Sequence, residues 1–191
     1  MKEKIAKIIR TCTIAPIMAM VTLVIFYLTE PQIFGKMYNL AFALLFLTVL
    51  PVLAYPLQKY IPGYKDKGRE GQRTLAMIFA VCGYVFGCLM TLCLNAPIEM
   101  WLIYLTYMMS GACVVLINKL FHFRASGHAC GAAGPIALLV CLGVPVLIPG
   151  FILVGIVWWA SLVLKRHTLP QLVGGTTIPL SAIVILNVLL R

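Results

Sequence analysis

Acidic side chains are scarce in this sequence, and none of them lies within an apolar run. Only 5 of the 191 residues are Asp or Glu, and Glu99 stands at the end of an apolar segment rather than inside it. Proton- and sodium-coupled transporters usually depend on carboxylates at membrane depth. The sequence therefore argues against a coupled transporter.

Motifs for nucleotide cofactors and metal ions are missing as well. There is no Walker loop, no glycine-rich dinucleotide turn and no cluster of metal ligands, so we expect neither a cofactor nor a metal. The cysteines form no C-x-x-C pair, and nearly all lie in apolar segments. We interpret them as small core residues without disulfides: Cys12, Cys82, Cys88, Cys93, Cys113, Cys130 and Cys141.

Apolar residues dominate the composition. The chain is 62% hydrophobic and only 10% charged, and its mean hydropathy is +1.03. These values are foreign to soluble domains and typical of polytopic membrane proteins. Because backbone polar groups in a bilayer must be satisfied internally, apolar segments of spanning length are helices. The predicted fold is all-α, a single transmembrane helical bundle over residues 1–191.

Polar segments divide the chain into seven expected spans, of which the last three are short, so six to seven helices are predicted. The basic stretch before the first span is interpreted as a flank of a retained helix, not as a cleaved signal peptide. The expected spans are residues 11–29, 37–57, 74–94, 98–118, 130–148, 151–164 and 176–190.

Three polar islands stand between these spans: residues 65–73, 123–128 and 165–168. Two spans separate each island from the next, so all three emerge on the same face of the membrane. This parity allows residues far apart in the sequence to build one pocket.

The formal net charge is +10, and every basic residue except Lys36 and Arg191 is expected on the face that carries the islands. The positive-inside rule places this face in the cytoplasm. Short basic loops between apolar spans fit topology, anionic lipid headgroups or a phosphorylated substrate. The sequence contains no pattern of aromatic and basic residues that would indicate a nucleic-acid-binding groove. The basic residues at the N-terminus are assigned to topology alone: Lys2, Lys4, Lys7 and Arg10.

The islands hold complementary chemistry for a phosphate. Cations and backbone N–H groups at helix starts bind phosphate oxygens. Two histidines, His128 and His167, could divide the roles of nucleophile and proton donor in phosphoryl transfer.

The order of these motifs resembles the type 2 phosphatidic acid phosphatase (PAP2) superfamily, whose pattern is K-x6-R-P, P-S-G-H and S-R-x5-H-x3-D. Residues 125–128, Ala-Ser-Gly-His, stand for the second motif, and His167 with Thr168 stands for the third. Residues 172–175, Leu-Val-Gly-Gly, resemble the continuation into the last helix. The motifs cover about residues 65–175, and the implied PAP2-like core covers about residues 59–190.

The resemblance implies a mechanism without metal. His167 attacks phosphorus to form a phosphohistidine, His128 protonates the departing alcohol, and water then hydrolyses the intermediate. The phosphate oxygens are held by Lys67, Arg73, Ser126 and the Gly127 N–H, with Arg124 as a further candidate.

Three departures from the pattern bear on catalysis. Lys67 and Arg73 are one residue too close together, and Thr74 replaces the proline. Ser161 stands where the family has a phosphate-binding arginine, for which Arg124, Lys165 or Arg166 are possible substitutes. Gln171 stands where it has an aspartate. A glutamine carbonyl can still accept the His167 N–H and fix the tautomer, but it cannot balance a developing positive charge.

The function predicted from the sequence is hydrolysis of a lipid phosphate, such as phosphatidic acid, phosphatidylglycerol phosphate or a polyprenyl (pyro)phosphate, in a bacterial inner membrane. Membrane lipids are the other expected partners. Two alternatives stay open: a catalytically impaired relative that binds lipid phosphates, and a small transporter or scaffold whose basic loops only set topology. Bacterial members of the family often face the periplasm, in conflict with the charge-based orientation.

Overall fold

The computed structural model describes residues 1–191 as helices joined by short connections, without strands. The elements in order are α1 (Lys2–Cys12), α2 (Ala15–Thr29), η1 (Pro31–Phe34), α3 (Met37–Leu44), η2 (Leu45–Val49), α4 (Leu50–Leu57), η3 (Gln58–Tyr60), α5 (Gly68–Cys93), α6 (Ile98–Leu120), α7 (Gly127–Cys141), α8 (Leu147–Val163) and α9 (Leu169–Leu190). The predicted all-helical bundle is confirmed.

Four helical segments are long and apolar enough to cross a membrane: the continuous segment Met37–Tyr60, α5, α6 and α9. The pair α1 and α2, bent by 59°, makes a fifth if it counts as one broken span. The lengths of these helices identify an integral membrane protein. α7 and α8 are shorter apolar helices, so length and composition give four or five spans where the sequence predicted six to seven.

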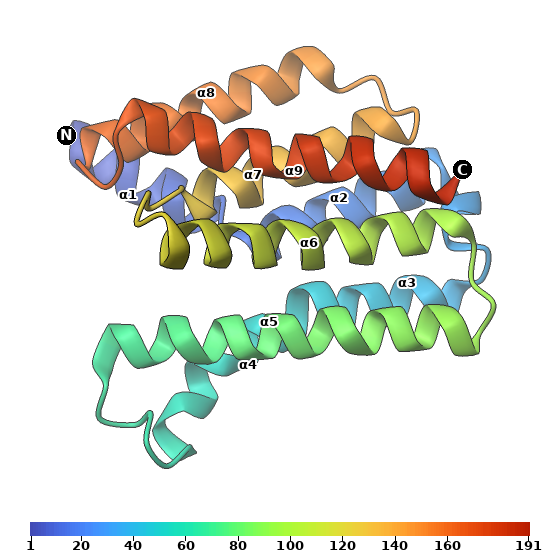
Figure 1. Ribbon diagram of the computed structural model, residues 1–191, viewed down its shortest axis with the longest axis horizontal. Helices are drawn as coiled ribbons and strands as arrows, with labels where there is room; N and C mark the ends of the chain where they lie inside the picture. Colours follow the sequence, from blue (N-terminus) through green and yellow to red (C-terminus); the bar gives the residue numbers. More distant parts are fainter.

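All three polar islands lie at one end of the bundle. The N-terminus, the connection between η3 and α5, the loop between α6 and α7, and the turn between α8 and α9 all lie on the left of Figure 1, whereas the C-terminus lies at the opposite end. The expectation from span parity is therefore met in the arrangement of the helices.

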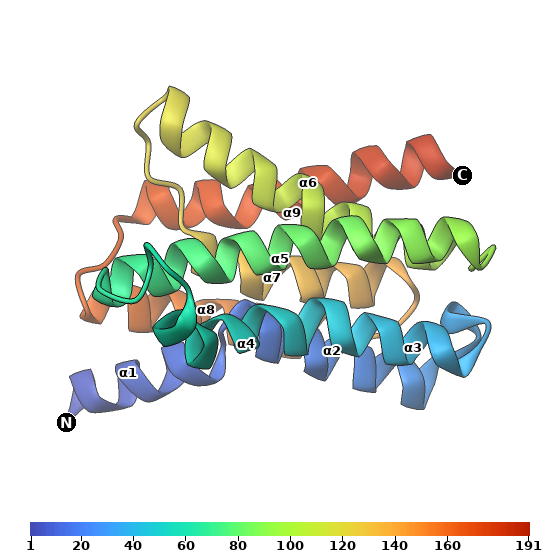
Figure 2. The same cartoon turned by 90° about the horizontal axis from the view of Figure 1, so that it is seen from below.

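The first helix begins earlier than expected and does not continue straight into the second. α1 covers residues assigned to a basic flank, and the chain bends at Thr13 and Ile14 before α2 begins at Ala15, with Pro16 in its first turn. A proline lacks the backbone N–H and is favoured in the first turn of a helix. The bend sends α1 away from the axis of α2 (Figure 2), and α1 packs against α8.

Two helices start closer to the islands than the sequence suggested, because polar side chains cap them. Ser126 accepts a 3.3 Å hydrogen bond from the Ala129 N–H and so starts α7 at Gly127 instead of residue 130. Thr168 and Gln171 form a reciprocal capping box that starts α9 at Leu169 instead of residue 176. Each cap satisfies backbone donors that a helix start leaves free. Both histidines consequently stand at helix N-termini.

Candidate functional site

The His167 ring is held in one tautomer by Gln171. Its Nδ1 lies 3.2 Å from Gln171 Oε1. The same oxygen accepts the Thr168 backbone N–H at 3.2 Å, as the capping box requires. An oxygen in this position cannot donate, so Nδ1 carries the proton. The unprotonated nitrogen of His167 is then Nε2, the form that a nucleophile requires.

His128 is held from an unexpected part of the chain. Its Nε2 lies 2.9 Å from Oγ1 of Thr13, at the bend between α1 and α2. The Thr13 hydroxyl donates its only hydrogen to the Ile9 carbonyl at 2.7 Å. It therefore accepts from His128, whose Nε2 carries the proton. The nitrogen of His128 that can gain and release a proton is Nδ1.

The Ser126 loop is attached directly to the start of α9. The Ser126 N–H donates a 3.0 Å hydrogen bond to the Gln171 carbonyl, and the Ser126 side chain is fully buried. Gly175 allows this approach, because a Cβ there would lie only 2.3 Å from the Ser126 carbonyl oxygen. Both sequence-predicted histidine motifs are thus parts of one packed unit.

Arg10 enters the same region from α1. Its Nη1 donates a 2.7 Å hydrogen bond to Oγ of Ser161, a fully buried residue near the end of α8. The Ser161 hydroxyl in turn donates to the Val157 carbonyl. The sequence assigned Arg10 to topology alone and did not anticipate this contact, which leaves the side chain half-buried between α1 and α8.

Three exposed arginines lie near this centre: Arg73, Arg124 and Arg166. Arg73 and Arg166 lie close enough to Arg10 to act on its charge, Arg10 and His167 act on His128, and Arg10 and Arg124 act on His167. No carboxylate is among these neighbours. Arg124 has a left-handed backbone (φ +58°), which is uncommon for non-glycine residues and recurs at functional sites. We call Arg10, Arg73, Arg124, Arg166, His128 and His167 the cationic cluster.

Lys67 is not brought into contact with the cluster. It is exposed before the first turn of α5, and its ammonium lies 5.3 Å from the centre of the Tyr64 ring. Gly127 is exposed at the first position of α7, next to His128. No group of three His, Cys, Asp or Glu side chains is arranged to hold a metal ion.

Burial and positive neighbours depress the pKa of both histidines. His128 stands in the first turn of α7, where burial, followed by the charges of Arg10 and His167, lowers its pKa to about 4. Burial also lowers the pKa of His167. Hydrogen bonds to Gln171 and to the backbone of Arg124 oppose this shift, whereas the charges of Arg10 and Arg124 add to it. Both imidazoles are therefore neutral at pH 7 while the site holds no anion.

No protein-family model, curated protein or solved structure matches this chain. The resemblance to the PAP2 superfamily stays a prediction that rests on the motifs quoted above.

Arg10 and Thr13 are the site residues that sequence reasoning missed. Both precede the first expected motif by more than 50 positions and lie outside the predicted core of residues 59–190. The one local signal was the Ile14-Ala15-Pro16 sequence, which favours a break before α2. It indicates a bend, but not that the bend brings residues 10 and 13 to the histidines.

Proposed function

We propose that this protein is a metal-independent lipid-phosphate phosphatase. The observation that supports the proposal most directly is the cationic cluster, in which four arginines and two histidines gather at one end of an apolar bundle without a carboxylate. Like charges held near one another repel, and Arg10, the half-buried arginine of the cluster, is also partly removed from water. A phosphate monoester dianion supplies the opposite charge and matches guanidinium groups geometrically.

Arg10 is proposed to bind a phosphate oxygen from a fixed position. The Ser161 hydroxyl takes one of its donors, and the remaining N–H groups are available for the ligand. Arg73, Arg124, Ser126 and the start of α7 are proposed to supply further contacts, the last because N–H groups at a helix start attract anions. Lys67 is assigned a smaller role, attraction of the anion from outside the cluster.

In the proposed reaction, the bond from His167 Nε2 to phosphorus forms as the bond from phosphorus to the alcohol oxygen breaks. The departing oxygen takes a proton from His128 Nδ1. Water then attacks the phosphohistidine, releases inorganic phosphate and returns a proton to His128. Nucleophilic and acid–base roles thus fall to two residues that different partners hold in complementary tautomers.

The bound phosphate itself favours the protonated form of His128, which is the proposed general acid. His128 is neutral without a ligand, but a dianion beside it favours the imidazolium and raises its pKa. The acid therefore forms only when substrate is present.

A lipid substrate follows from the place of the cluster in the bundle. The charged groups lie at one end of helices whose outer surfaces are apolar, so an amphiphile can keep its tail in the membrane and its phosphate in the cluster. We propose a bacterial inner membrane as the location, with the cluster on the cytoplasmic face as the positive-inside rule indicates.

A second candidate function is binding of a lipid phosphate without turnover. It is favoured by Gln171, which orients His167 but adds no negative charge to stabilise the phosphorylated ring.

The decisive experiment measures phosphate release from dioctanoyl phosphatidic acid and farnesyl phosphate by the purified protein, beside His167→Ala and His128→Ala. A phosphatase loses activity in both variants, and acid-labile phosphate becomes trapped on the wild type but not on His167→Ala. His122→Ala is the matched control, because His122 is an exposed histidine of the same loop outside the cluster. Binding without release supports the second candidate, and release that survives His167→Ala excludes the phosphohistidine.

A further inference from the structure

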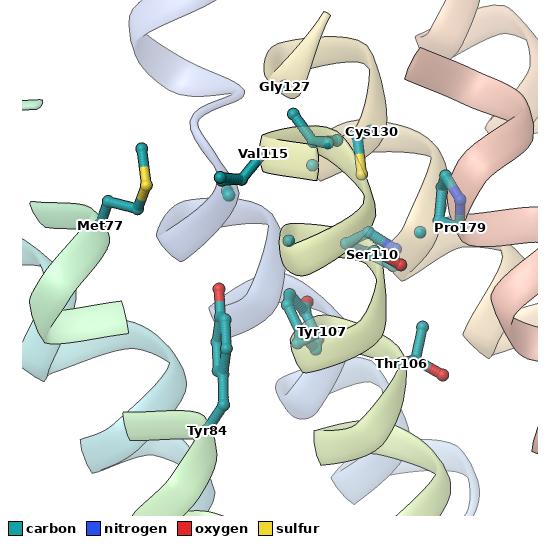
Figure 3. A pocket seen from close by; sticks show the side chains of 15 residues that line it. Met77, Tyr84, Thr106, Tyr107, Ser110, Val115, Gly127, Cys130 and Pro179 are labelled. Atoms are coloured by element: carbon teal, nitrogen blue, oxygen red, sulfur yellow. The ribbon is translucent and has the colours of Figure 1, made fainter. Parts of the chain in front are cut away.

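A cavity of about 180 Å³ lies inside the bundle beside the cationic cluster. Met77 and Tyr84 contribute from α5, Ser110 and Val115 from α6, and Gly127 from the start of α7, with Pro179 of α9 on the far side (Figure 3). Most of its lining is apolar. The cluster supplies no side chain to it, but Gly127 is the immediate neighbour of His128.

Hydroxyl groups of α6 in this lining have no hydrogen-bond partner. Thr106, Tyr107 and Ser110 all line the cavity, and their buried oxygens are unpaired. Thr106 is only 1% exposed and Ser110 only 5%. A buried hydroxyl without a partner is destabilising, so such groups call for an explanation by a ligand or water.

The same residue types behave differently elsewhere in the bundle. The buried hydroxyls of Thr91 and Ser161 donate to the carbonyl four residues earlier in their own helices, at 2.8 Å in both cases. This bond is the usual solution for Ser and Thr within a helix. Thr106 and Ser110 lack it. Because they are spaced four residues apart, both stand on one face of α6.

The cavity has a polar end and a lipid end. Gly127 joins it to the helix start at which the phosphate is proposed to bind, and Met77, on its other side, is 50% exposed on the outer surface of the bundle. Thr106 to Val115 cover about 14 Å of helix at a rise of about 1.5 Å per residue. A molecule in the cavity can therefore extend from the start of α7 along α6, beside the half-exposed Met77.

We propose that this cavity binds the ester-linked glycerol region of a diacylglycerol phosphate. The inference rests on the proposed function and narrows its substrate class. The ester carbonyls of such a lipid lie a few bonds from its phosphate and accept hydrogen bonds, whereas a polyprenyl chain has no acceptor. A cavity of about 180 Å³ has room for this region of the lipid. The chains leave past Met77.

The test compares dioctanoyl phosphatidic acid with its dioctyl ether analogue, which lacks only the two carbonyls. The wild type is expected to favour the ester about tenfold in kcat/KM. The double variant Thr106→Val with Ser110→Ala is expected to remove this preference while hydrolysing para-nitrophenyl phosphate normally. Thr91→Val is the control, since its hydroxyl is bonded within α5 and does not line the cavity.

Binding of the same two lipids to His167→Ala, measured as a thermal shift, separates this inference from the phosphatase itself. One outcome is that the protein hydrolyses neither lipid and yet binds the ester more tightly than the ether. This outcome supports the subsite and contradicts the proposed phosphatase function. Equal hydrolysis or binding of ester and ether by otherwise active protein overturns the subsite, as does a preference that survives in the double variant.

Filling the cavity gives an independent test. A Cβ at Gly111 would meet only Tyr84, at an ordinary 3.7 Å, so a larger side chain can enter the space. Gly111→Leu is expected to lower kcat/KM for dioctanoyl phosphatidic acid about tenfold or more and leave para-nitrophenyl phosphate unaffected. Gly155→Leu on α8, where a Cβ meets no atom within 4 Å, is the control. Equal effects of the two variants on the lipid contradict the proposal.

Discussion

Arg10 and Ser161 are 151 residues apart in the sequence, yet a 2.7 Å hydrogen bond joins the guanidinium of one to the hydroxyl of the other. Ser161 stands where the predicted resemblance to the PAP2 pattern would place an arginine. α1 thus places an arginine against the residue of α8 at this position. Of the substitutes considered from the sequence, Arg124 and Arg166 lie in the cationic cluster, but neither makes this contact.

Because of this contact, we predict that an arginine at position 161 of α8 can replace the arginine at position 10 of α1. Arg10→Ala is expected to reduce kcat/KM for a lipid phosphate about 100-fold, since removal of one positioned donor to a developing charge costs roughly 10²–10³. Adding Ser161→Arg to Arg10→Ala is expected to recover most of the loss. Lys7→Ala, an exposed cation on the same helix, is the control. A double variant no better than Arg10→Ala contradicts the prediction.

How much the sequence reveals depends on how local the relationship is. The helices, the shared end of the islands and the contact from His167 to Gln171 follow from composition, parity and a spacing of four residues. Arg10 and Thr13 do not, because only the 59° bend and the packing of α1 on α8 bring them to the site. The unpaired hydroxyls of α6 are also invisible in sequence, since Ser and Thr within helices usually bond their own backbone.

Gln171 is neutral, and a carboxylate in its place is predicted to change kcat. Gln171→Glu keeps the length of the side chain and its acceptors for His167 and Thr168, and adds a carboxylate beside the ring that becomes positively charged. We expect kcat at pH 8 to rise about tenfold. The carboxylate also raises the pKa of His167, so the acidic limb of the pH–rate profile moves to higher pH. Gln171→Leu, which removes both acceptors, is expected to be slower than wild type; a rate equal to wild type in either variant would contradict this role.

Anion binding is expected to take up protons. The pKa of His128 is about 4 without a ligand, and a bound dianion raises it, so the complex holds more protons than the free protein near pH 6.5. By linkage, affinity increases as pH falls toward 5. Calorimetry of vanadate binding in two buffers of different ionisation enthalpy measures the uptake. His128→Ala is expected to reduce it and His122→Ala to leave it unchanged. Equal uptake in the wild type and His128→Ala would assign the protons elsewhere.

The face of the membrane that carries the cluster can be determined with single cysteines. In a variant without native cysteines, Lys65→Cys lies at the end with the islands, and Arg191→Cys lies at the opposite end. A membrane-impermeant maleimide added to intact cells is expected to label Arg191→Cys only, because the basic loops indicate a cytoplasmic cluster. Labelling of Lys65→Cys alone would place the cluster outside the cytoplasm.

The attachment of the Ser126 loop to α9 predicts a large effect from one methyl group. In Gly175→Ala the Cβ would lie 2.3 Å from the Ser126 carbonyl oxygen, a backbone atom that cannot rotate away as a side chain does. The loop must then separate from α9 and lose the 3.0 Å bond from Ser126 to the Gln171 carbonyl. We expect a loss of about 1–3 kcal/mol in the free energy of unfolding.

The same separation moves Ser126 and His128 away from His167, so vanadate binding is expected to weaken together with the thermal unfolding midpoint of the protein in detergent. Gly155→Ala is the matched control, because nothing lies within 4 Å of its Cβ and alanine favours a helix over glycine by about 0.5–1 kcal/mol. If Gly175→Ala lowered stability but left anion affinity intact, Ser126 and the two histidines would not act as one site. If it changed neither, the loop would not be seated on α9 at all.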